Sequence, residues 1–335
     1  MTLHRLAIEQ IVDDLRVGPP VPAWARPDTP NIVAVAIDAS PAEVSAASDV
    51  PDLVVPVRLA AVVVAVASAV TAPPAWCDVL VDEGSLELER INRIVHDTPI
   101  AATALVQLLR GAEHRSMDDG LQLESALYST LQAGPEFARW RAARDVRRRA
   151  EVDEPAVLVE RDDDTLVISL NRPHVHNALN ARMRDELLEA LDIARTDPDI
   201  GMVELTGVGS SYCSGGDLDE FGSFADPASA HLVRTSAAIG PVLAALGDRV
   251  HVRLHGACFG SGVELPAFAA RVSADDDTRI SLPELSLGLI PGAGGTWSIP
   301  RRIGRHRTAL MALTGDEIDA VTAASWGLVD ERSGA

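Results

Sequence analysis

Strand-like and helix-like segments alternate along the second half of the chain, and this order most constrains the fold. Short β-branched runs lie at 156–159, 165–170, 202–205 and 250–254. The first two resemble a hairpin across 162–164, and a long helix is expected over 228–246. Asn180 can cap another helix, one that carries its apolar residues on one face. Such alternation is typical of βαβ units around a largely parallel, covered sheet.

Three glycine-bearing loops follow strand ends in this half. The first contains Ser214, Gly215, Gly216 and Asp217, the second Gly260, Ser261 and Glu264, and the third Glu284, Gly292 and Gly294. Ligands bind outside the carboxyl ends of strands in open α/β sheets, so we expect a site at these loops. Carboxylates beside bare glycine backbone suit proton transfer next to a developing oxyanion. The alternative is that the glycines only make tight turns.

Charge and composition exclude several classes of partner. The formal net charge is −20, which argues against nucleic acid or an anionic membrane surface as partner. Three cysteines are too few and too scattered for a disulfide framework or a zinc cluster, so we expect buried thiols and no metal. The most apolar stretch, 59–72, is about fourteen residues long, whereas a bilayer span needs roughly twenty. No apolar signal core follows Met1, so a cytoplasmic protein is expected.

The N-terminal half divides into two regions by pattern. Strands are expected at 31–37, 53–57 and 62–66, although the last could equally be helical. From Ser85 onward the apolar spacing is helical, over 86–95, 100–109 and 121–131. We therefore predict an α/β region over 1–84, a helical region over 85–150 and a third unit over 151–335.

Taken in order, the motifs of the third unit resemble those of the crotonase (enoyl-CoA hydratase/isomerase) superfamily. They are Asn171-Arg172-Pro173 with Asn177-Ala178-Leu179-Asn180, Ser214-Gly215-Gly216-Asp217-Leu218, His255-Gly256-Ala257-Cys258 with Glu264-Leu265, the run 283–296, Leu313-Thr314-Gly315, and Trp326-Gly327-Leu328-Val329-Asp330-Glu331. The resemblance covers roughly 155–332. No single motif is decisive, but the ordered set is specific.

The resemblance implies an α/β crotonase fold of repeated ββα units, here with an N-terminal α/β-plus-helical extension. It also implies a homotrimer or hexamer and an acyl-CoA thioester substrate, with coenzyme A as part of the substrate and no separate cofactor. The thioester enolate would be held in an oxyanion hole by the amides of Gly216 and Ser261, although the family usually has glycine where Ser261 stands. Other residues matched to substrate-binding positions are Asn177, Ala178, Ser214, Gly215, Asp217, Gly260, Gly292 and Gly294.

By the same resemblance, Glu264 and Glu284 match the two glutamates that hold water in enoyl-CoA hydratases. Glu264 would help activate the water, and Glu284 would deliver or remove the proton at C2. Enoyl-CoA hydratase is therefore the expected activity. The alternatives are an enoyl-CoA isomerase, a cofactor-independent arylacetyl-CoA dioxygenase on the same fold, and a non-catalytic acyl-CoA-binding subunit.

One departure from the family concerns the cap over the active site. Ordinary crotonases continue beyond the segment that matches 326–331 as helices that cover the site, whereas this sequence stops at Ala335. Residues 76–83 loosely repeat the 326–331 pattern, and the helical segments after residue 85 look like the missing helices. We therefore hypothesise that 85–150 supplies the cap and that 1–84 is a relic crotonase-like segment. The alternative is chance similarity among amphipathic helices.

Overall fold

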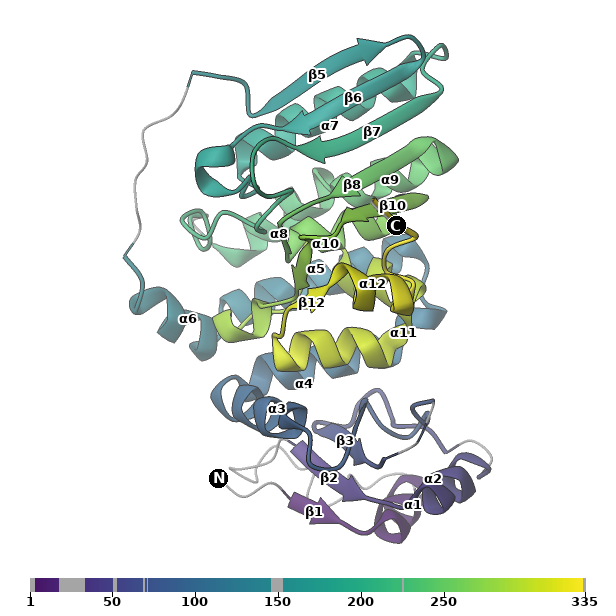
Figure 1. Cartoon of the computed structure of the whole chain (residues 1–335). Helices are drawn as coiled ribbons and strands as arrows, with labels where there is room; N and C mark the ends of the chain where they lie inside the picture. The colour runs from purple at the N-terminus through teal and green to yellow at the C-terminus, as the bar shows by residue number, and fades with distance from the viewer. Residues whose placement is uncertain are drawn as a thin grey trace.

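Two sheets lie at opposite ends of the molecule, with helices between them (Figure 1). The computed structural model describes residues 4–17, 34–50, 53–68, 70, 72–145, 153–224 and 226–333. A four-stranded sheet is formed by the N-terminal region, and a six-stranded sheet by the second half of the chain. The expected mixed α/β organisation is therefore present in both halves.

The six-stranded sheet has the order β13-β10-β8-β7-β6-β5. Its strands are β5 (Val157–Asp162), β6 (Thr165–Leu170), β7 (Met202–Gly207), β8 (Val250–Leu254), β10 (Arg271–Asp275) and β13 (Glu331–Ser333). β5 and β6 form an antiparallel hairpin, and all other neighbouring pairs are parallel. Asp163, at the hairpin turn, adopts a left-handed φ of 52°, which aspartate tolerates better than most residues. The predicted hairpin and parallel strands are confirmed.

A smaller three-stranded sheet positions the second and third glycine-bearing loops. Its strands are β9 (Ala257–Phe259), β11 (Arg279–Ser281) and β12 (Ile318–Asp319). β9 and β11 are parallel neighbours, so the chain leaves both at the same edge. β9 leads into the short helix α10 (Ser261–Glu264), and β11 into a 3-10 turn, Glu284–Leu287. Parallel pairing therefore brings the two glutamate-bearing segments together.

One helix of this half begins and packs as the sequence predicts. Asn180 caps α7 (Ala181–Thr196), since its Oδ1 accepts the Met183 amide at 2.9 Å. Met183, Leu187, Leu191 and Ala194 lie on its buried face.

The long helix expected over 228–246 is two helices, α8 (Pro227–Ser236) and α9 (Ile239–Leu246). Pro241 explains the break, because a proline ring inside a helix clashes with the carbonyl four residues earlier, here that of Ala237. Ala237 accordingly leaves helical geometry. By length and composition the run Pro227–Arg249 could cross a membrane. Here it is interrupted, and its two helices pack against α5 and α7 respectively.

The N-terminal sheet contains β1 (His4–Leu6), β2 (Ala34–Asp38), β3 (Val62–Val66) and β4 (Val79–Val81), all parallel and in sequence order. Helices α1 (Ile8–Val17) and α2 (Pro41–Ser48) accompany it. The strand at 62–66 is confirmed, and part of the one expected at 31–37 lies outside the described residues. The strand expected at 53–57 is wrong. Pro56 has no N–H to donate to a ladder, and the Val55 amide instead binds the Ala75 carbonyl.

Helices from both halves fill the space between the sheets (Figure 1). From the N-terminal half come α3 (Leu86–Asp97), α4 (Pro99–Arg110), α5 (Met117–Gln132) and α6 (Pro135–Ala142). From the second half come α11 (Gly295–Thr314), which is interrupted at Gly304, and α12 (Ala320–Trp326). Since α11 packs against α3, α4, α5 and β4, it joins the two halves.

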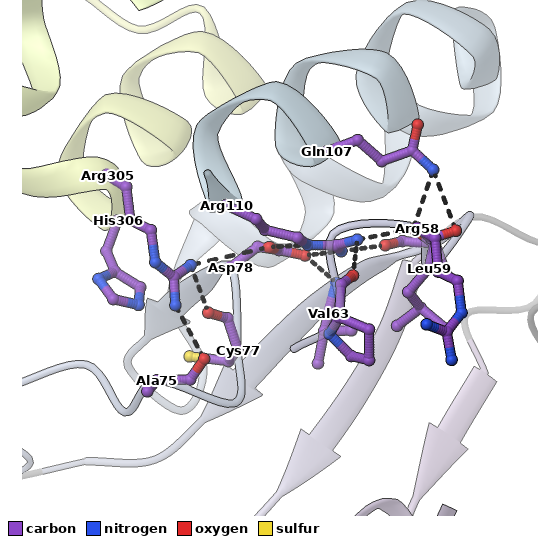
Figure 2. Close-up of polar contacts among 12 residues, drawn as sticks. Arg58, Leu59, Val63, Ala75, Cys77, Asp78, Gln107, Arg110, Arg305 and His306 are labelled. Carbon is purple, nitrogen blue, oxygen red and sulfur yellow. Dashed lines mark hydrogen bonds and ion pairs between the residues drawn. The ribbon is translucent and has the colours of Figure 1, made fainter. Parts of the chain in front are cut away.

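A buried polar network attaches the N-terminal sheet to these helices (Figure 2). Arg110 of α4 pairs with Asp78 at 2.6 Å, and both side chains are at most 2% exposed. Arg110 also donates to the carbonyls of the 56–61 segment. Arg305 of α11 donates to the carbonyls of Cys77 and Ala75 at 2.9 and 2.8 Å. Because every partner in 56–78 precedes α3, the first of these helices, the network fixes how the N-terminal sheet docks.

Candidate active site

The three glycine-bearing loops meet around a cavity of about 380 Å³. A short backbone bridge between Cys213 and Cys258 lies just before the first and second loops, and another joins Gly216 of the first loop to Leu179. Of the predicted residues, Gly216, Asp217, Ser261, Glu264, Glu284 and Gly292 line this cavity. The fold therefore brings together both glutamates and both predicted amide donors.

The amides of Gly216 and Ser261 are not used by the backbone ladder. Among the described residues, neither donates a hydrogen bond, whereas the neighbouring Asp217 amide binds the Leu179 carbonyl. Gly215 and Gly260, immediately before them, have φ of 100° and 50°, conformations that residues with a Cβ rarely adopt. The Ser261 hydroxyl lies 3.9 Å from the Cys213 thiol. Two free amides facing one cavity can bind a developing oxyanion.

Glu264 lies on α10 and is 2% exposed. Its Oε2 accepts the amides of Ala293 at 2.8 Å and Gly295 at 2.9 Å. Burial raises the pKa of Glu264 to about 7, against the opposing effect of these amides. Both of these bonds go to Oε2, and the Gly292 amide also lowers the pKa of the carboxyl group.

Glu284 begins the 3-10 turn after β11 and is 7% exposed. Its Oε2 is buried and has no hydrogen-bond partner among the described residues. Burial raises the pKa of Glu284 well above its usual range, and the charge of Glu264 adds to the effect. Its Oε1 is close to Gly260, where a Cβ would come within 2.3 Å of it. A protonated Glu284 beside a titrating Glu264 forms an acid–base pair.

Helices α5 and α6 complete the cavity from the N-terminal half. Tyr128, Gln132 and Phe137 line it. The packing that the cap hypothesis requires is present, whereas the derivation of these helices from a family cap, like the relic origin of 1–84, stays a prediction.

Sequence reasoning missed a third carboxylate, Glu124 of α5, which is 2% exposed. Its Oε1 accepts the Gly294 amide at 2.7 Å, and its Oε2 accepts the Thr296 amide and hydroxyl at 2.9 and 2.6 Å. Burial raises its pKa, and the charge of Glu264 adds to the effect. The sequence held a clue, because Glu124 lies three residues from both Leu121 and Leu127 and so shares their apolar face.

The remaining predicted substrate-binding residues lie outside the lining of the main cavity. Asn177 is buried and fully used by the backbone: Nδ2 donates to the carbonyls of Val208 and Ser211, and Oδ1 accepts the Arg172 amide. The Ala178 carbonyl accepts from Arg172, and Ser214 donates to the Val175 carbonyl. Asp217 does line the cavity, but it also pairs with Arg172 at 3.0 Å. Contacts of these residues with substrate stay predictions.

A second cavity of about 240 Å³ adjoins the first. The two share Leu179, Arg184, Arg234, Gly292 and Ala293. Its other apolar lining comes from α5, the α8–α9 break and Leu265, and Gly294 also lines it. The break that Pro241 imposes thus borders a space beside the glutamates.

The three cysteines are buried and unpaired, as expected. Within the described ranges, no cluster of His, Cys, Asp and Glu is arranged to hold a metal ion.

Comparison with known proteins gives concordant matches. The family model described as "Enoyl-CoA hydratase/isomerase" matches residues 160–333. A "Probable enoyl-CoA hydratase" of Mycobacterium bovis is 35% identical over 175 residues, which are 52% of this chain and 66% of that protein. The 2,3-dehydroadipyl-CoA hydratase of Escherichia coli is 33% identical over 175 residues, covering 52% and 68%. The chain thus spans just under two thirds of the first relative and slightly more of the second.

A solved structure agrees. The crystal structure of enoyl-CoA hydratase from Thermoplasma volcanium superposes with a TM-score of 0.51 and 33% identity, covering 54% of this chain and 73% of that one.

Proposed function

The chain belongs to the enoyl-CoA hydratase/isomerase family and has the crotonase fold, and from this premise we propose that it hydrates an enoyl-CoA. An acyl-CoA thioester is the substrate class consistent with its relatives. The observation that carries the proposal is the pair of buried glutamates, Glu264 and Glu284, lining one cavity with two free amides.

In the proposed reaction the thioester oxygen binds the amides of Gly216 and Ser261. Water adds to C3 of the enoyl group, the C2–C3 π bond breaks, and its electrons move onto the thioester as an enolate. The two amides stabilise that charge, and each such donor typically contributes about 10²–10³ in rate. Collapse of the enolate then places a proton on C2.

The two glutamates divide the proton transfers. Glu264 titrates near neutral pH and lines the cavity, so it takes the proton of the attacking water. Glu284 holds its proton because burial raises its pKa, so it supplies the proton to C2. Water and alkene thus give one 3-hydroxyacyl product, with no electron donor or acceptor needed.

Crotonyl-CoA tests this proposal directly. We expect loss of the conjugated enoyl absorbance with the parent protein, and a decrease of about 10²–10⁴-fold in kcat for Glu264→Gln and for Glu284→Gln. Glu136→Gln is the matched control, because this buried glutamate binds the amides of Ile100 and Ala101 instead. Turnover that survives both active-site substitutions would refute the two-glutamate mechanism. Tight CoA binding without turnover of any enoyl-CoA would favour a non-catalytic acyl-CoA-binding subunit.

The second cavity supports a further part of the proposal, that the acyl tail extends past Glu264 between α5 and the α8–α9 break. Ala238 lines this second cavity and is absent from the lining of the first. Ala238→Trp should therefore lower kcat/KM for octenoyl-CoA and leave that for crotonyl-CoA nearly unchanged. An equal loss for both substrates would place the tail elsewhere. Assembly as a homotrimer or hexamer stays a prediction that light scattering would test.

A further inference from the structure

The buried carboxylates of Glu264 and Glu124 bind alternate amides of one short backbone segment, 293–296. The amides of Ala293 and Gly295 bind Oε2 of Glu264. The intervening amides of Gly294 and Thr296 bind Glu124. Four successive N–H groups therefore alternate between the catalytic helix α10 and the cap helix α5. The segment leads into α11, whose N-terminal end favours negative charge.

We infer that Glu124 is a positioning residue for Glu264: it holds in place the 293–296 segment, whose Ala293 and Gly295 amides bind the Glu264 carboxylate. The inference rests on the proposed acid–base role of Glu264. Through the shared segment, a shift of α5 would move both amides that orient the Glu264 carboxylate.

The shared segment couples Glu124 to the titration of Glu264. The amides of Ala293 and Gly295 lower the pKa of Glu264 against the effect of burial. Three donors hold Glu124 on the same segment. Loosening that attachment would weaken the two amide bonds to Glu264, so Glu264 would keep its proton to a higher pH.

Other ionisable groups surround this pair. Tyr128 lies on the same helix as Glu124, and Arg234 of α8 is over the Tyr128 ring at 4.5 Å. Arg234 donates to Ser125, Ser129 and Gln132, and its charge lowers the pKa of Tyr128, which burial raises more strongly. Cys213 and Glu284 interact electrostatically with Glu264, whose charge raises the pKa of both. A substitution at Glu124 also changes the charge that Tyr128, Arg234 and Glu284 face, so Glu124→Asp, which keeps the carboxyl group, is the variant that isolates position.

Glu136 separates this role from ordinary helix capping. It is a buried glutamate of α6 that binds two amides, those of Ile100 and Ala101, at the start of α4. It therefore resembles Glu124 in burial and hydrogen bonding, but its carboxylate does not bind the 293–296 segment. Loss of stability alone would be common to both sites.

The test compares the full-length parent with Glu124→Gln, Glu124→Asp and Glu136→Gln. Infrared pH titration of the Glu264 carboxyl, assigned by subtraction of Glu264→Gln, needs no turnover. For Glu124→Gln and Glu124→Asp we expect this titration, and the acidic limb of kcat/KM with crotonyl-CoA, to move roughly one pH unit higher. Glu124→Asp keeps the carboxyl group but shortens the reach, so kcat should decrease roughly tenfold or more with little change in KM. Glu136→Gln should leave the titration and kcat unchanged.

Each outcome supports or contradicts the positioning role of Glu124. An unmoved infrared titration in both Glu124 variants, or an unchanged kcat in Glu124→Asp, would overturn the positioning role. If Glu124→Gln does not fold, the kcat and KM of Glu124→Asp still decide positioning. A shifted titration in a protein without hydratase turnover would uphold the coupling while the proposed function fails.

Discussion

Breaking the Asp78–Arg110 pair should strongly destabilise the docked N-terminal sheet (Figure 2). Asp78→Asn keeps the shape of the side chain and removes its charge. The Arg110 guanidinium would then remain buried with only neutral acceptors, namely the carbonyls of Pro56, Leu59 and Ala61 and the one amide oxygen that the substitution leaves. The Val63 amide, now bound to Asp78 Oδ2 at 2.9 Å, would lose a charged acceptor.

Burial sets the magnitude of this effect. Removing one partner of a buried pair leaves an uncompensated charge and typically costs about 3–5 kcal/mol. Arg110→Met should cost less, because Arg305 lies 3.9 Å from Asp78 and partly compensates the remaining carboxylate. The double variant should cost less than the sum of the single ones, since it leaves neither charge unpaired.

Urea unfolding followed by Trp fluorescence measures these effects, because Trp76 is fully buried two residues from Asp78. Asp192→Asn is the matched control: its pair with Arg195 is more than half exposed, and exposed pairs contribute about 1 kcal/mol or less. If Asp78→Asn lowered the unfolding free energy no more than Asp192→Asn, the network would contribute no net docking energy and the reasoning would be refuted.

Three further predictions concern the site. Gly260→Ala should reduce kcat by about 10²-fold or more, because its Cβ would meet Glu284 Oε1 at 2.3 Å. Gly84→Ala is the control for backbone strain, since Gly84 has a φ of +77° and open space around it. Equal activity in the two variants would contradict this prediction. Asn177→Ala should lower the unfolding free energy by about 1–3 kcal/mol, since it leaves buried backbone groups unpaired, and should leave KM for crotonyl-CoA unchanged; a raised KM would instead indicate substrate contact. The folded protein keeps a proton on Glu264 up to about pH 7, whereas the unfolded chain loses it near 4.5. Urea unfolding across this range should therefore show the parent losing stability relative to Glu264→Gln as pH rises, and a parallel pH dependence would contradict the raised pKa.

The alternation in the second half was sufficient to predict its fold. Strands β5 to β8 and the Asn180 cap depend on local patterns of apolar residues and one side-chain hydrogen bond, which are legible without tertiary contacts. The errors lie where longer-range effects compete. The spacing of apolar residues over 228–246 predicts one helix. The steric effect of Pro241 on Ala237 divides this run into two helices. The segment 53–57 has strand-like composition, but its Val55 amide donates to the Ala75 carbonyl and not to a neighbouring strand.

The site divides in a similar way. Gly216, Ser261, Glu264 and Glu284 could be selected from sequence, because the order in which glycine loops and acids follow the strands is specific to one family of sites. Asn177 was selected by the same reasoning, yet its side chain is fully used by the backbone around it. A motif indicates that a residue type is required at a position, but it does not indicate whether that requirement is structural or functional.

By itself, the sequence determined the parallel sheet, the glycine loops and the presence of two acids next to them, since these depend on spacing along the chain. Only the tertiary structure decided that α5 covers those acids, that Glu124 shares a backbone segment with Glu264, and that Arg110 and Arg305 dock the N-terminal sheet. These contacts join residues that are far apart in sequence, from 32 between Asp78 and Arg110 to 230 between Ala75 and Arg305. The physical reason is that burial turns distant polar groups into obligatory partners, and burial is a property of the packed chain.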